Sequence, residues 1–140
     1  MMKVAKEKMP AAYVEHVQRV CAETERRFGD DSLEAIVARL HDSLEDNEFS
    51  VGEVAGVIRK SLVFPPTPAL RDVLMDAVVC ITRRSEETYA EYIQRVKRNP
   101  LARRVKIVDL ETNLFGSPTL PPGSLTERYV KALHTLKNLL

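Results

Sequence analysis

The sequence contains no tryptophan, only 2 cysteines and only 5 glycines among 140 residues. Glycine occurs at about half of its usual frequency of roughly 7%, which indicates a chain with few tight turns. Cys21 and Cys80 lie too far apart in sequence to form a CxxC metal motif, and two cysteines make no disulfide framework. We therefore expect both to be reduced thiols, as in a cytosolic protein.

Long hydrophobic runs and a large excess of either charge are also missing. The longest apolar runs, such as AVVCI at 77–81, are far shorter than the roughly 18 residues needed to span a bilayer. The first ten residues contain no hydrophobic core of a signal peptide. Lys and Arg number 21 against 20 Asp and Glu, whereas binding to nucleic acid polymers or to anionic membranes needs a positive excess. We expect a soluble, cytoplasmic protein with neither partner.

The residues that are present predict a helical domain. Hydrophobic residues make up 44% and charged residues 29% of the chain, as in folded globular proteins, and the length suits one domain over 1–140. Apolar residues recur at helical spacing between proline-containing segments, and no strand pattern is present. The sequence therefore predicts an all-α bundle of about seven helices.

The prolines and the capping patterns suggest where these helices begin and end. VFPPTP at 63–68 is expected to be non-helical. Two capping boxes and one N-cap followed by proline are expected at Ser50/Glu53, Ser124/Glu127 and Asn99/Pro100. The expected helices cover approximately 11–28, 32–45, 50–61, 69–82, 86–98, 100–115 and 124–139.

Three polar residues lie on apolar helices. His16 and His41 each share an apolar stripe, and Asp109 lies in the most apolar helix, over 100–115. A histidine in such a place is most often a core residue. A buried aspartate needs a partner, because an unpaired buried charge costs several kcal/mol. An arginine, a lysine or a metal ion could be that partner.

The segment HDSLED concentrates acidic side chains. His41 and Glu45 are neighbours at i,i+4 on a helix, and so are Asp42 and Asp46. Three carboxylates on two turns repel one another unless a cation binds there. A solvated acidic face is the alternative, but it fits poorly because His41 also belongs to the apolar stripe.

Two imidazoles and two carboxylates on three helices could therefore meet at one divalent cation. Mixed nitrogen and oxygen ligands suit Mn²⁺, Fe²⁺, Co²⁺ or Zn²⁺ rather than a structural thiolate site.

Three segments carry a resemblance to a known family. YVEHVQRV at 13–20 resembles Y-I-x-H-P-x-x-V, and ARLHDSLEDN at 38–47 resembles L-L-H-D-x-x-E-D-T. RRVKIVDLETNL at 103–114 resembles V-K-L-A-D-x-x-x-N-L. These are motifs of the HD-domain metal-dependent phosphohydrolases, in the RelA/SpoT-type branch. The stretches at 82–102 and 127–133 are similar to the small stand-alone guanosine polyphosphate pyrophosphohydrolases, so the resemblance covers about 13–138.

The resemblance implies a complete set of site residues. It implies the metal ligands His16, His41, Asp42 and Asp109 and the catalytic pair Glu45 and Asp46. The implied cofactor is one divalent metal ion, Mn²⁺ first, with Fe²⁺, Co²⁺, Ni²⁺ or Zn²⁺ as alternatives. The candidates for contacts with the phosphates or the base of a nucleotide substrate are Asn113, Lys106, Arg83, Arg84 and Tyr129.

The implied reaction is hydrolysis of the 3′-pyrophosphate of guanosine tetraphosphate-type alarmones. Val17 and Asn47 replace the family's Pro and Thr, and only 15 residues precede His16, so we expect part of the guanine pocket to be missing. Another nucleotide or a small phosphate ester is the alternative substrate. A catalytically silent protein that binds a nucleotide or a protein partner is the third hypothesis. The intact pair Glu45 and Asp46 argues against it.

Overall fold

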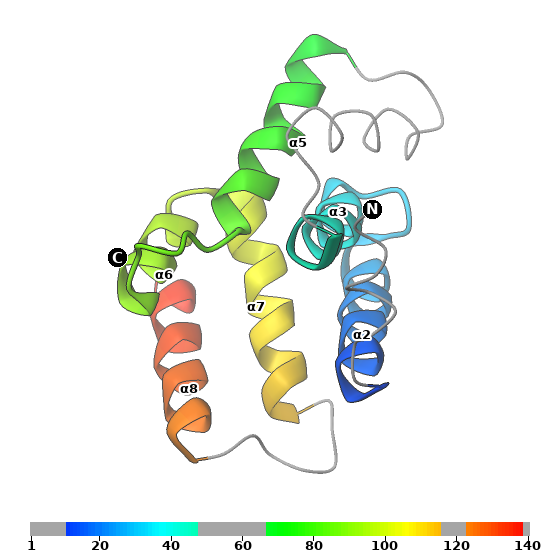
Figure 1. The fold of residues 1–140 in the computed structure, drawn as a ribbon. Helices are drawn as coiled ribbons and strands as arrows, with labels where there is room; N and C mark the ends of the chain where they lie inside the picture. The colour runs from blue at the N-terminus through cyan, green and yellow to red at the C-terminus, as the bar shows by residue number, and fades with distance from the viewer. Residues whose placement is uncertain (1–10, 48–66, 116–122, 139–140) are drawn as a thin grey trace.

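The computed structural model describes residues 11–47, 67–115 and 123–138. Its elements there are all helices, and no strand occurs in these ranges, so the all-α prediction is confirmed. The expected helix at 50–61, with its capping box, lies outside the described residues. The six helices shown in Figure 1 are α2 (Ala11–Phe28), α3 (Leu33–Asn47), α5 (Pro68–Ile81), α6 (Tyr89–Lys97), α7 (Pro100–Phe115) and α8 (Gly123–Lys137).

Helix α7 lies at the centre of the described fold. It contacts each of the other five helices, with α8 on one side and α2 and α3 on the other (Figure 1). Half of its residues are buried, as expected from a helix that is apolar on most sides. A polar side chain on α7 is therefore surrounded by protein and needs partners from the neighbouring helices.

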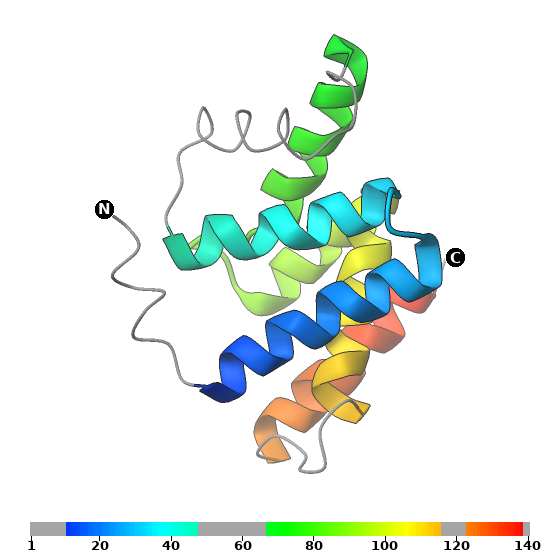
Figure 2. The ribbon, with the colours of Figure 1, turned by 90° about the vertical axis from the view of Figure 1, so that its right-hand side faces the viewer.

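The core confirms the predicted apolar faces. Figure 2 shows α2 and α3 side by side, and both pack against α7. The expected inward residues Val20, Val37, Leu40, Tyr92, Ile93 and Val96 are buried. All of these except Val20 belong to one core cluster with Leu74, Val78 and Ile81 of α5 and with Ala132 and Leu136 of α8.

A glycine turn joins α2 to α3. Gly29 has φ of 102°, a conformation that favours glycine, and its N–H donates to the carbonyl of Glu25 at 2.7 Å. Ser32 Oγ then accepts the N–H of Ala35 at 3.1 Å at the start of α3. These caps end α2 at Phe28 as predicted and return the chain antiparallel to it.

Three predicted helix starts need correction. Helix α5 begins at Pro68, inside the segment expected to be non-helical, because proline is tolerated at the first position after the N-cap Thr67. Helix α6 begins at Tyr89 rather than 86, because Thr88 and Glu91 form a capping box that the sequence analysis missed. Helix α8 begins at Gly123, so Ser124 lies inside the helix and is not its N-cap.

Other sequence expectations hold. Asn99 Oδ1 accepts the N–H of Ala102 at 3.0 Å, and Pro100 is the first residue of α7. Cys21 and Cys80 are not joined in a disulfide, and each is partly buried. Among the described helices, none has both the length and the apolar character needed to cross a membrane.

Candidate functional site

The centre of the candidate site is a hydrogen bond between α2 and α7. His16 Nε2 lies 2.8 Å from Asp109 Oδ1, although the two residues are 93 positions apart in sequence. Their side chains are only 20% and 16% exposed. An ionised carboxylate can only accept a hydrogen bond, so the imidazole donates from Nε2. The structure thus brings together the first and the last of the four predicted metal ligands.

Lys106 holds the other oxygen of the same carboxylate. Its Nζ donates to Asp109 Oδ2 at 2.8 Å, across one turn of α7, and the lysine side chain is only 11% exposed. Sequence analysis placed Lys106 near the site as a substrate contact. In the structure it is a direct partner of Asp109, so the buried aspartate has the charged partner that its position requires.

This pairing fixes the ionisation of both groups. Burial by itself raises the pKa of the Asp109 carboxyl, but the Lys106 ammonium and the His16 hydrogen bond outweigh it and hold that pKa well below its usual range. Burial lowers the pKa of Lys106, but Asp109 outweighs that effect and raises it well above its usual value. At neutral pH the site therefore contains a carboxylate and an ammonium.

Two tyrosines of α6 lie beside this pair. Lys106 Nζ is 5.3 Å from the centre of the Tyr92 ring, and the Tyr89 ring meets Tyr92 edge-on at 5.8 Å. Burial raises the pKa of Tyr89; Asp109 adds to that rise, while Lys106 opposes it. The charges of Lys106 and Asp109 therefore act on Tyr89, the first residue of α6.

Two arginines from other parts of the chain contact the Tyr89 ring. The guanidinium carbon of Arg83, in the connection between α5 and α6, is 5.4 Å from the ring centre. That of Arg128, in α8, is 4.8 Å from the same centre. Both distances fit cation–π contacts. Arg83 was a predicted substrate contact, whereas Arg128 was not, because nothing in local spacing relates α8 to α6.

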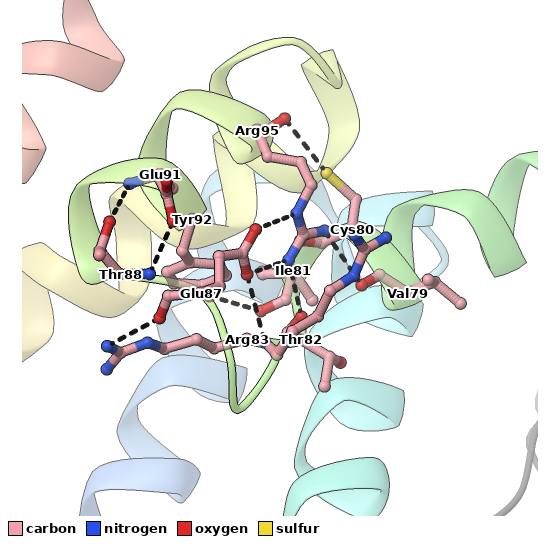
Figure 3. Close-up of polar contacts among 11 residues, drawn as sticks. Val79, Cys80, Ile81, Thr82, Arg83, Glu87, Thr88, Glu91, Tyr92 and Arg95 are labelled. Carbon is pink, nitrogen blue, oxygen red and sulfur yellow. Dashed lines mark hydrogen bonds and ion pairs between the residues drawn. The ribbon is translucent and has the colours of Figure 1, made fainter.

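Arg95 holds the connection that contains Arg83 (Figure 3). Its guanidinium makes two hydrogen bonds to the Glu87 carboxylate, at 2.7 and 2.8 Å. It also donates to the carbonyls of Cys80 and Thr82, at 2.8 and 3.0 Å. One side chain therefore satisfies carbonyls at the end of α5, which lack helical partners.

Glu87 also connects this network of hydrogen bonds to Arg83. The Arg83 guanidinium donates to the Glu87 carbonyl at 3.3 Å. The Arg95 guanidinium lowers the pKa of the Glu87 carboxyl to about 2. Sequence analysis missed Arg95 and Glu87, because residues eight apart across a helix start form no recognisable pattern. The pattern Thr-x-x-Glu at 88–91 was the available signal that this segment is an ordered helix start.

The other predicted substrate contacts, and His134, differ in how far they are buried. Asn113 is half-buried, and its Nδ2 donates to the carbonyl of Asp109 at 3.3 Å. Arg84 is exposed, and its backbone N–H donates to the Glu87 carboxylate at 3.2 Å. Tyr129 is half-buried against the core. His134, expected at the surface, is exposed.

The predicted metal ligands of α3 are only partly described. Asp42, Glu45 and Asp46 belong to α3, but their side chains lie outside the description. His41 is half-buried, with its Nε2 atom buried, on a helix that packs against both α2 and α7. Within the described side chains, no three His, Cys, Asp or Glu residues gather as a metal site requires.

The donors that do meet fit a divalent transition metal in their chemistry. An imidazole nitrogen and a carboxylate oxygen from two helices are adjacent, and both are common ligands of Mn²⁺, Fe²⁺ and Zn²⁺. His41 and Asp42 would have to complete the set. Binding there would also require Asp109 to share its charge with Lys106, since that ammonium is held by the second oxygen.

A separate groove of about 640 Å³ runs along the same two helices, lined by residues including Arg19, Arg27, Glu111 and Phe115. It contains neither His16 nor Asp109. Charges in the groove are already paired: Arg27 Nη1 lies 2.6 Å from Glu111 Oε1, and Arg27 Nε lies 2.7 Å from Glu23 Oε2. We therefore place the chemistry at Asp109 and not in this groove.

Comparison with known proteins gives no further assignment: no protein-family model matches the sequence, and no curated protein matches it.

Proposed function

We propose that this chain is a metal-dependent phosphohydrolase of the HD type, and that its substrate is the 3′-pyrophosphate of a guanosine tetraphosphate-type alarmone. The contact between His16 and Asp109 is the observation that carries the proposal. The motif resemblance requires these two residues, from opposite ends of the sequence, to serve one site. Their adjacency supports that requirement.

The proposed metal ligands are His16, His41, Asp42 and Asp109. A divalent ion such as Mn²⁺, when bound, supplies Lewis acidity and lowers the pKa of water so that hydrolysis proceeds near neutral pH. The fit rests on the chemistry of the His16 and Asp109 donors and on the packing of α3, which carries the other two, against both of their helices.

The protein's own groups would handle the proton and the charge. In this proposal Glu45 and Asp46, one turn beyond His41 and Asp42 in sequence, orient the attacking water and accept its proton. The water oxygen forms a bond to the nearer phosphorus, the bond from that phosphorus to the ribose 3′ oxygen breaks, and pyrophosphate leaves. The 3′ oxygen takes a proton and becomes a hydroxyl.

Lys106 supports a phosphate substrate by its position. Its ammonium is charged at neutral pH, nearly buried and hydrogen-bonded to the Asp109 carboxylate. A cation held in a site of low polarity stabilises developing negative charge more than an exposed one does. Asn113, which lies one turn beyond Asp109, offers an amide on the same helix.

The first test is the metal content. Protein purified without chelator should contain close to one Mn, Fe, Co, Ni or Zn ion per chain by elemental analysis. Asp109→Ala should lose that metal, while Asp76→Ala, at an exposed position on α5, should keep it. Wild-type protein that binds none of these metals under any loading condition would contradict the proposal.

The second test is a substrate panel with added Mn²⁺. It contains guanosine tetraphosphate, its adenosine analogue, simple deoxynucleotides and an aryl phosphate. Turnover of the alarmones well above the rest supports the assignment. Turnover of the simple compounds alone would assign the protein to the broader phosphohydrolase class. No turnover in metal-loaded protein would favour a silent binding protein.

A further inference from the structure

We infer that Arg83, Tyr89 and Arg128 form a binding site for a diphosphate group, referred to below as the arginine clamp. The inference rests on the proposed function for the identity of the natural substrate, and it assigns a place to that substrate's diphosphate. The three residues come from the α5–α6 connection, from α6 and from α8.

The arrangement concentrates positive charge at one point. Both guanidinium carbons contact the same aromatic ring, at 5.4 and 4.8 Å from its centre, so they are at most about 10 Å apart. A tyrosine ring attracts a cation but carries no net charge to neutralise it. Two like charges held this close repel each other unless an anion lies with them.

Two carboxylates in the contacts around the clamp already have other partners. Glu87 is bound at both oxygens by Arg95, and Asp109 is bound by His16 and Lys106. Among the side chains that the structure describes, neither Arg83 nor Arg128 forms an ion pair with a carboxylate. Within the described part of the chain the clamp thus lacks a negative partner, and a bound anion would supply one.

The chemistry of the clamp suits phosphate oxygens. Guanidinium groups present several N–H donors in a plane and bind phosphates through two hydrogen bonds at a time. Two of them can serve the two phosphorus centres of one diphosphate. A single orthophosphate can bind both guanidinium groups only if they lie close together, whereas a diphosphate also spans the wider separation that the two ring contacts allow.

The position of the clamp relates it to the proposed reaction centre. Tyr89 contacts Tyr92, Tyr92 contacts Lys106, and Lys106 contacts Asp109. The Tyr89 pKa responds to the charges of both Lys106 and Asp109, which places the ring within electrostatic reach of the ion pair. The clamp therefore borders the site where the proposed hydrolysis occurs.

Binding of inorganic pyrophosphate by titration calorimetry tests the clamp directly. The variants are Arg83→Gln, Arg128→Gln and the double variant, with Arg98→Gln as the matched control, because Arg98 is an exposed arginine at the opposite end of α6. Each single variant should weaken pyrophosphate binding about tenfold, and the double variant about a hundredfold. The control should bind as the wild type does, and orthophosphate should bind wild type more weakly than pyrophosphate.

Unchanged pyrophosphate affinity in the double variant would overturn the clamp, and so would an equal loss in Arg98→Gln or no binding by wild type. Both arginines are exposed, so thermal unfolding should show intact folding in every variant. If the arginine variants weaken pyrophosphate binding but the wild type hydrolyses no compound of the panel, the clamp is supported and only the proposed function is contradicted. If the wild type hydrolyses the alarmone and the double variant keeps the same KM and the same pyrophosphate affinity, only the clamp is contradicted.

Discussion

His16 and Asp109 contact each other at 2.8 Å across the interface of α2 and α7, and Lys106 holds the second oxygen of the same carboxylate. An imidazole, a carboxylate and an ammonium thus form one continuous polar group between packed helices. Removing any member leaves a polar or charged group with too few partners. Four predictions follow from this group, from the acidic segment of α3 and from the Arg95 network.

Asp109→Asn should destabilise the metal-free protein by about 3–5 kcal/mol, because the Lys106 ammonium would remain nearly buried without its counter-ion. Urea unfolding in the presence of chelator measures this effect apart from metal binding. Asp76→Asn, at an exposed site, should change stability by less than about 0.5 kcal/mol. Adding Lys106→Met to Asp109→Asn should recover part of the loss. Equal stability of wild type and Asp109→Asn would contradict the role of the ion pair.

Glu45→Gln and Asp46→Asn should retain the metal and lose at least about 10²-fold in hydrolysis, the scale of a well-placed acid or base. The reason is that the motif assigns both to the proton transfer and neither to metal binding. Elemental analysis and initial rates on guanosine tetraphosphate separate these effects. Glu86→Gln, a change in an exposed residue of the α5–α6 connection, serves as the control for both. Loss of metal in both variants would show that the roles within HDSLED are assigned wrongly.

Glu87 should contribute stability that depends on pH. Arg95 lowers its pKa in the folded protein to about 2, below the ordinary value of 4.5. The contribution is therefore complete above pH 4.5 and is lost as the pH falls towards 2. The difference in unfolding free energy between wild type and Glu87→Gln should shrink over this range. A constant difference for Glu87→Gln from pH 6 to 2.5 would contradict the prediction.

Arg95→Lys should destabilise the protein by about 1.5–3 kcal/mol although the charge is kept. A lysine ammonium cannot bind the Glu87 carboxylate through two parallel hydrogen bonds and also reach the carbonyls of Cys80 and Thr82. Arg98→Lys on the same helix should have almost no effect, because Arg98 is exposed. Denaturant midpoints of the two variants give the comparison, and similar midpoints would show that the network adds no stability.

Local sequence patterns predicted the helices well where their ends have local causes. Helix α2 ends at Phe28 because Gly29 adopts a positive φ, and α7 begins at Pro100 because Asn99 caps it. The errors arose where two local rules competed. Proline at 68 predicts non-helical chain, but the first helical position tolerates it, and the Thr88 cap sets the start of α6.

The sequence by itself determined the helical class, the limits of α2 and α7 and the residues able to carry chemistry, because these depend on side-chain type and on spacing within one helix. It also placed Lys106 one turn from Asp109. It could not show that Lys106 pairs with Asp109 itself, that Arg95 holds Glu87, or that Arg128 meets Tyr89. Contacts of this kind depend on the angle and register at which α6, α7 and α8 pack. Those quantities are set by the whole buried core together, so only the tertiary structure decided them.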